Sequence, residues 1–180
     1  MKFCLHLGVL GNWPVLDISR DDFERLKKAK RGLFVLVGIE EKFEMLLDNY
    51  VDYEQELLRI ALGHMVSHNV DYLEMNDGRP SMNRRLANLL TMTRLYTDQV
   101  KHDLSGLYGR ESTQLASIEK RFKGESANAL GYRAMETIRN SMQHRDLPIR
   151  SIVYHSGWED GPNGERLQHR TVVQISVEHL

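Results

Sequence analysis

Apolar residues recur at intervals of three or four along most of the chain up to about residue 145, a spacing typical of amphipathic helices. Ser19, followed first by acidic and then by basic residues, predicts a helix over about 20–31. Gly32 is expected to interrupt this helix, and a longer one is expected from about 35 to 75. The apolar positions of the longer pattern are Phe43, Leu46, Leu47, Tyr50, Val51, Tyr53, Leu57, Leu58, Ala61 and Met65.

The stretch "NDGRPS" predicts a turn, because Asp77, Gly78 and Pro80 are residue types that favour turns. Ser81 is then placed to cap a second long amphipathic helix, expected over about 82–102. The sequence "SGLYGRES" is expected to end that helix.

Two shorter helices are expected next, one over 113–123 that ends at Gly124 and a last one capped by Ser126. Pro148 restricts the backbone of the residue before it, so the last helix should stop near 145. Its buried stripe is expected to be Ala129, Tyr132, Met135, Ile138 and Met142.

Beyond Pro148, β-branched residues become frequent and partly alternate with polar ones, which predicts a β-hairpin with strands at roughly 150–156 and 170–178. The stretch "GWEDGPNGERL" should form a long loop between them, and "FCLHLGVL" near the N-terminus is a candidate third strand. We therefore expect a mainly α fold in one domain, 1–180: an up-and-down helical bundle over about 20–146, a C-terminal hairpin over about 149–180, and a possible extra strand within 1–18.

Composition fits a soluble globular protein, with 41% hydrophobic and 27% charged residues. Cys4 is the only cysteine, which excludes an intrachain disulfide and a cysteine-based zinc site. Charges interrupt every apolar run, so no membrane association is expected and a cytoplasmic location is the simplest interpretation.

Charge is unevenly distributed although the net charge is only −1. Residues 1–78 hold 9 Lys+Arg and 14 Asp+Glu, a net −5, whereas residues 79–150 hold 13 and 7, a net +6. Residues 151–180 hold 2 and 4, a net −2. The basic segment can present a face that attracts anions, and the alternative is a chance difference between solvated helices.

The last helix carries a group of residues suited to phosphate chemistry. Asn140 and His144 lie about 40° apart around that helix, whereas Arg139 and His144 lie about 140° apart. Unpaired carbonyl groups at the end of the helix favour a protonated imidazole, which is able to act as an acid.

The stretch "RNSMQH" at 139–144, placed near the end of the last long helix, resembles the signature of the HEPN (higher eukaryotes and prokaryotes nucleotide-binding) domain family. That signature is an arginine, a polar residue that is often asparagine, and a histidine four to six positions after the arginine. The earlier helix "NRRLANLLTMTRLYTDQVKH" is similar to one found in bacterial members associated with abortive infection.

The resemblance covers roughly 35–146 and implies a helical bundle that acts as a metal-independent endoribonuclease of toxin or phage-defence type, needing no cofactor. It implies catalytic roles for Arg139, Asn140 and His144, with cleavage through attack of the ribose 2′-OH. It also implies a homodimer that sets two motifs across one cleft, and leaves room for a cognate antitoxin. Candidate RNA contacts are the basic residues Arg84, Arg85, Lys101 and Arg145.

Other interpretations remain open. The chain is alternatively a catalytically silent relative that binds RNA or nucleotide, or a protein-interaction module such as an antitoxin-like partner. His64 and His68 are four residues apart, as two metal ligands on one helix can be, with Asp52 and Glu56 upstream.

As an alternative to RNA contacts, Arg84 and Arg85 are expected to lie on a solvent-exposed helix face without a binding role. Asn83 and Asp98 have an alternative role in holding helices together by polar contacts. The tyrosines on the apolar stripes, Tyr50, Tyr53, Tyr96 and Tyr132, are expected in the core.

Overall fold

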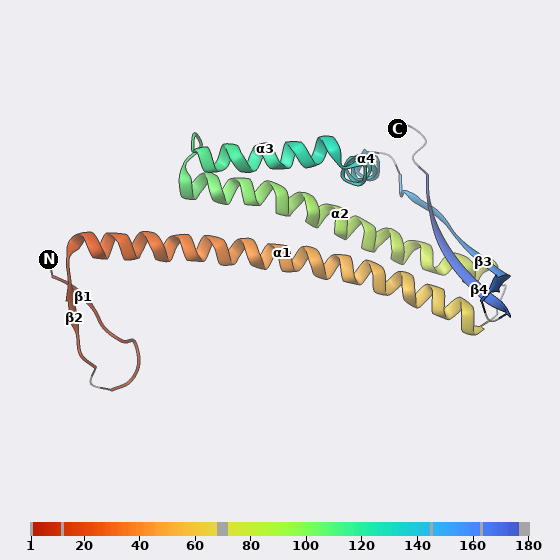
Figure 1. Ribbon diagram of the computed structural model, residues 1–180, viewed down its shortest axis with the longest axis horizontal. Coiled ribbons are helices and arrows are strands. Elements are labelled where there is room, and N and C mark those ends of the chain that lie inside the picture. Colours follow the sequence, from red (N-terminus) through yellow and green to blue (C-terminus); the bar gives the residue numbers. More distant parts are fainter. Residues whose placement is uncertain (1, 12, 68–71, 145, 163, 177–180) are drawn as a thin grey trace.

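The computed structural model describes residues 2–11, 13–67, 72–144, 146–162 and 164–176. In these residues the chain forms a mainly helical bundle with a two-stranded antiparallel sheet at its C-terminal end, as the sequence predicts (Figure 1). The elements in chain order are β1 (Phe3–Leu5), β2 (Leu16–Ile18), α1 (Arg20–Ser67), α2 (Tyr72–Tyr108), α3 (Thr113–Asn128), α4 (Leu130–His144), β3 (Ile149–Gly161) and β4 (Gly164–Ile175).

Helix α1 is continuous, so the expected break at Gly32 and the expected extension to residue 75 are both wrong. The predicted N-cap is confirmed, because the Asp22 amide donates to Ser19 Oγ at 3.0 Å. Gly32 lies inside the helix, where a single glycine costs only about 1 kcal/mol relative to alanine. The side chain of Leu107 from the last turn of α2 lies 3.9 Å from a Cβ built at that position, which is an ordinary contact. Residues 20–30 extend past the end of α2, since Arg31 already reaches the carbonyl of Gly106 (Figure 1).

Helix α2 begins before the "NDGRPS" stretch, so the turn predicted there is wrong and Pro80 lies inside the helix. Gly78 is a packing position: a Cβ placed on it would lie 2.7 Å from Ile60 Cδ1 of α1 and 3.2 Å from Ile152 Cδ1 of β3. The residue allows α1, α2 and the hairpin to meet closely. Ser81, predicted as an N-cap, donates instead to the Gly78 carbonyl and to Glu56.

Helices α3 and α4 are separated at Ala129, whose backbone is extended, rather than at Gly124. Ser126, the predicted cap of the last helix, therefore lies within α3, and the N-cap of α3 is Ser112. Figure 1 shows α4 running across the end of α3 along the line of sight. The predicted end of the last helix is confirmed, because α4 stops at His144.

The C-terminal hairpin is confirmed, but its strands are longer than predicted and nearly all of the expected loop is paired. The ladder runs from Ile149 opposite Ile175 to Gly161 opposite Gly164, with an irregularity between Ile149 and Ser151. The extra strand suggested within 1–18 is present as β1, but it does not join the C-terminal hairpin, because it pairs with β2 in a separate sheet at the start of α1.

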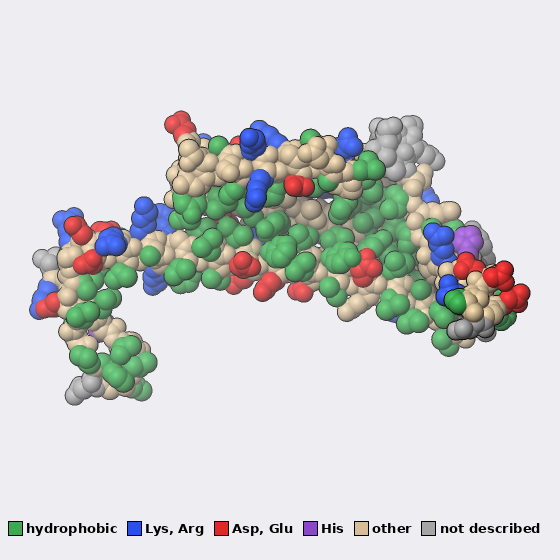
Figure 2. Space-filling model, in the orientation of Figure 1, with side chains coloured by type: hydrophobic (Ala, Val, Ile, Leu, Met, Phe, Trp, Pro, Cys, Tyr) green, Lys and Arg blue, Asp and Glu red, His purple; other side chains and the backbone are tan. Residues whose placement is uncertain are grey.

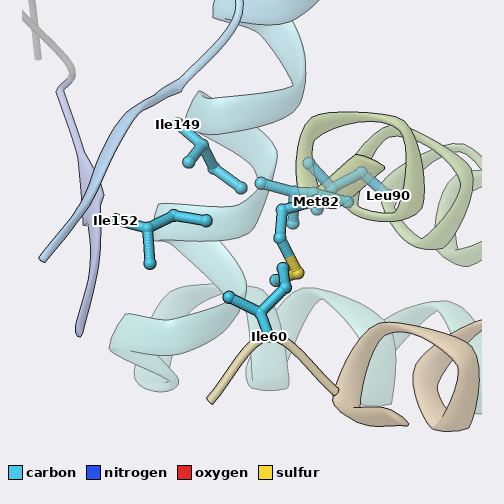
Figure 3. Close-up of a cluster of buried hydrophobic side chains, with 6 residues drawn as sticks. Ile60, Met82, Leu90, Ile149 and Ile152 are labelled. Carbon is cyan, nitrogen blue, oxygen red and sulfur yellow. The ribbon is translucent and has the colours of Figure 1, made fainter. Parts of the chain in front are cut away.

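The main core lies where α1, α2, α4 and the hairpin meet (Figure 3). Ile60, Met82, Leu90, Ile149 and Ile152 converge there with Leu86, and the stripe residues Met135, Ile138 and Met142 of α4 pack against them. A second cluster of Val100, Leu104 and Leu115 joins α2 to α3.

Candidate functional site

Helix α4 places the three motif residues on two sides, with Arg139 toward α2 and with Asn140 and His144 toward solvent. Its apolar stripe faces the core, so that Arg139, next to Ile138, is half-buried against α2. Asn140 and His144 are exposed, with His144 in the last turn. Within the residues that the structure describes, no hydrogen bond or ion pair joins Arg139 to His144. The single chain thus presents an inward arginine and an outward polar pair.

Arg139 lines a small cleft between α2 and α4. The cavity has a volume of about 30 Å³, room for one or two water molecules. It is lined by Leu90, Thr93, Arg94 and Thr97 of α2 and by Tyr132, Met135, Glu136 and Arg139 of α4. Arg139 Nε is buried and has no hydrogen-bond partner among the described residues, and such a donor is costly to bury unless something binds it.

A second arginine stands in the same cleft. Arg94 donates to Asp98 at 2.7 Å and pairs with Glu136 of α4 at 3.6 Å. Burial, and secondarily the charge of Glu136, raise the pKa of Tyr132, which keeps this phenol neutral and able to donate a hydrogen bond. The cleft therefore combines two guanidinium groups with one carboxylate. The sequence indicated Arg139 but not Arg94, which resembles the other arginines of an amphipathic helix until α4 is packed beside it.

After α4, Asp146 is held by two contacts. The backbone N–H of Leu147 donates to Asp146 at 2.8 Å, and Arg150 pairs with the same carboxylate at 2.7 Å. These contacts, the first being the larger, hold the pKa of Asp146 below its usual value. Pro148 and Ile149 follow as buried residues, so the hairpin fixes where α4 ends. Arg145, a predicted RNA contact, lies outside the described residues.

Among the described residues, none of the other predicted RNA-binding residues is joined by a hydrogen bond or an ion pair to the motif residues Arg139, Asn140 and His144. Arg84 is exposed. Arg85 pairs with Asp52 of α1 at 2.5 Å, and its Nε is buried without a partner in the described part of the chain. The ammonium of Lys101 lies 5.4 Å from the centre of the Phe122 ring. Arg85 and Lys101 thus have structural partners within the bundle.

Glu56 is a buried carboxylate with hydrogen-bond partners on α1 and α2. The sequence indicated it only as a possible metal ligand. Glu56 accepts hydrogen bonds from Arg59, at 3.1 and 2.9 Å, and from Ser81. The Arg59 bond, followed by that of Ser81, lowers the pKa of Glu56 to about 2. The sequence did contain one indication that Glu56 is buried, because it has helical spacing with the residues of α1 that face α2.

The two histidines suggested as metal ligands do not form a described metal site. The ring of His64 stacks on Tyr154 of β3, with centroids 4.1 Å apart, and His68 lies outside the described residues. Among the residues described, no group of three or more His, Cys, Asp or Glu side chains is arranged to hold a metal ion.

Across the described residues, none of the helices combines the length and the apolar character that crossing a membrane requires. Compared with known proteins, the chain matches no family model, no curated protein and no solved structure.

Proposed function

We propose that the chain is a metal-independent endoribonuclease of the HEPN type, acting as a homodimer in toxin-like or phage-defence processes. The observation that carries the proposal is the buried, unpartnered Nε of Arg139 beside a cleft, on the same helix as exposed Asn140 and His144. The guanidinium of Arg139 has further donors besides its buried Nε, and a group of this shape is suited to bind phosphate oxygens.

From the protein, the proposed chemistry uses only side chains of α4. A water molecule accepts the proton of the ribose 2′-OH, whose oxygen then attacks the adjacent phosphorus atom. The phosphorus–O5′ bond breaks as the leaving oxygen takes a proton from a protonated His144, which is exposed in the last turn. In this proposal Arg139 stabilises the charge that develops on the oxygens of the phosphoryl group. Asn140, one turn before His144, orients the imidazole or the phosphate.

The outward face of α4 is suited to RNA rather than to pairing with another α4. Its apolar residues Met135, Ile138 and Met142 are used in the core, and apart from Leu130 its described exposed positions are polar or small. The pairing of final helices expected from the family resemblance thus finds little apolar surface there. Contact between two copies therefore needs another surface, and α1 offers one.

The test is incubation of the purified chain with RNA in excess chelator. The expected result is cleavage that leaves 2′,3′-cyclic phosphate ends, because the attacking group is the neighbouring hydroxyl. Cleavage that disappears with the chelator, or that leaves other ends, would contradict this mechanism.

A second candidate function is a silent RNA-binding module. It is favoured by the separation of Arg139 and His144, which no hydrogen bond joins within the described residues. This candidate predicts binding whose affinity falls steeply with salt and no cleavage under any condition tested. The same RNA assay, read for binding and for product, separates the two functions.

A further inference from the structure

Helix α1 carries two parallel seams of residues, each spaced alternately by three and four positions. The inner seam faces α2, and each of its members is buried or half-buried: Val35, Ile39, Lys42, Leu46, Asn49, Tyr53, Glu56 and Ile60. The outer seam is exposed throughout: Leu26, Ala29, Leu33, Leu36, Glu40, Phe43, Leu47 and Tyr50. Such spacing is the pattern by which helices pair as coiled coils.

The outer seam is the inner pattern displaced by one residue. Leu36 follows Val35, Phe43 follows Lys42, and the other matched pairs follow the same rule. One residue is about 100° of helix rotation, so the outer seam lies beside the inner one. Its member Phe43 borders α2, where its ring centre lies 5.7 Å from that of Tyr96, and the seam is otherwise open. Because α2 already occupies the inner seam, the outer seam needs a different partner.

The outer seam exposes more apolar surface than single scattered residues would. Leu33 is 64% exposed, Leu36 49%, Leu47 44% and Tyr50 50%. Leu26 and Phe43 of the seam, and Val37 and Val51 that flank it, are exposed to a similar degree. Together about half the surface of these eight large side chains is open to solvent, which is on the order of the roughly 800 Å² that each partner gives to a stable interface. Surfaces of this kind mark contact sites.

Charges along α1 identify what pairs with the seam. Residues 25–31 hold five Lys or Arg and no acid, whereas residues 40–54 hold six Asp or Glu and one Lys. In Figure 2, Lys and Arg gather over the N-terminal part of α1, and Asp and Glu follow its edge toward the middle. A second α1 running in the opposite direction would set each basic segment against the acidic segment of its partner.

The flanking residues agree with this orientation. Lys30, Glu44 and Asp48 lie within about 100° of the seam centre, on the side away from α2, where charged pairs of a coiled coil are found. Antiparallel pairing that centres residue 28 opposite residue 47 places Lys30 of one copy between Glu44 and Asp48 of the other. The two-fold axis then passes near Val37 and Gly38.

We propose that residues 20–55 of α1 pair antiparallel with the same residues of a second copy through the outer seam. The overlap is about 54 Å long, and it covers residues 20–30, which extend past α2 within each chain. The contact deepens the homodimer of the proposed function by assigning its interface. The proposed cleavage uses side chains of a single α4, so a failure of the contact and a failure of RNA cleavage can be told apart.

The first test is sedimentation equilibrium of the full chain at tens of micromolar, with the double variant Leu36→Glu and Leu47→Glu. The wild type is expected as a dimer and the double variant as a monomer with an unchanged circular dichroism spectrum, because both side chains are exposed. Leu62→Glu is the matched control, since Leu62 is 49% exposed on the same helix but lies beyond the overlap. A monomeric wild type, or a double variant that remains dimeric, would overturn the proposal.

The second test determines how the two α1 helices are aligned along each other, and it does not depend on the stability of the Leu→Glu variants. In a Cys4→Ser background, Leu36→Cys near the two-fold axis should crosslink to its own copy with a short bismaleimide, whereas Leu58→Cys should not. Asp48→Lys should weaken dimerisation about tenfold, and adding Lys30→Glu should restore it. Crosslinking at residue 58 but not at 36, or no rescue by the charge exchange, would overturn the antiparallel register.

Discussion

The side-chain amide of Asn83 forms two hydrogen bonds with the backbone of Ile149, accepting from its N–H at 3.1 Å and donating to its carbonyl at 3.0 Å. A residue of α2 thereby takes the position of a neighbouring strand at the start of the C-terminal hairpin. The contact is buried, and Asn83 is 2% exposed. The polar role that the sequence suggested for Asn83 as an alternative to function is confirmed, although it joins a helix to a strand.

Asn83→Ala should lower the free energy of unfolding by about 2–4 kcal/mol, because it leaves a buried N–H and a buried carbonyl of Ile149 without partners. Urea denaturation followed by circular dichroism measures the change. Asn49→Ala is the control, since among the described residues the Asn49 amide donates to the Met45 carbonyl within its own helix, and the change should cost less than about 0.5 kcal/mol. Equal losses in the two variants would contradict the structural role of Asn83.

Gly78→Ala should destabilise the protein by about 1–2 kcal/mol, although alanine is the better helix former by about 1 kcal/mol. The added methyl group would lie 2.7 Å from Ile60 Cδ1 in the core. Gly106→Ala, also in α2, meets nothing within 4 Å and should instead be stabilising. Thermal unfolding of the two variants tests whether packing or propensity decides at residue 78.

Glu56 should make stability depend on pH in the acid range. Its pKa lies near 2 in the folded chain against an ordinary 4.5, so its contribution is complete above pH 4.5 and is lost as the pH falls toward 2. At pH 7 Glu56→Gln should cost about 2–3 kcal/mol of unfolding free energy, and the difference from wild type should shrink below pH 4.5. The exposed neighbour variant Glu54→Gln should show no such pH-dependent gap.

If the proposed ribonuclease activity is present, His144→Ala should lower the cleavage rate about a hundredfold or more, equivalent to about 3 kcal/mol of transition-state stabilisation. Arg139→Lys should be nearly as damaging as Arg139→Ala, since an ammonium group cannot replace a planar guanidinium. Gln143→Ala and Arg133→Lys change exposed neighbours on α4 and should have little effect. Single-turnover kinetics measure these rates, and cleavage that is unchanged in the His144 and Arg139 variants would point to a contaminating nuclease.

The sequence predicted the type of almost every element but misplaced several boundaries, for a common reason. Gly32 and Gly78 were interpreted as breaks, yet both lie inside helices. Ile60 of α1 and Ile152 of β3 pack closely against Gly78, whereas at Gly32 the neighbouring Leu107 makes an ordinary contact and the cost of one glycine is only about 1 kcal/mol. Local residue preference does not contain those contacts. The end of α4 was placed correctly because Pro148 acts through its own backbone.

The candidate site was only partly visible in the sequence. The spacing of Arg139, Asn140 and His144 could be read directly, and so could the helix on which they lie. That Arg139 turns toward α2, and that Arg94 and Glu136 share its cleft, depends on how α4 crosses α2. Crossing geometry is set by packing in the core, which a single sequence does not specify residue by residue.

The part of α1 that extends past α2 links local order to protein concentration. A helical segment of about eleven residues is marginal in water on its own. Within one chain the ring of Phe3 from β1 packs on Phe23, with centroids 4.8 Å apart. Under the proposed pairing, the backbone amides of residues 25–30 gain further protection from a second copy, whereas those near Ile60 are protected within each chain. Hydrogen exchange of the first group of amides should therefore become faster on dilution, while exchange of the second group stays constant. The exchange rate at the N-terminal end of α1 would then depend on the concentration of the protein itself.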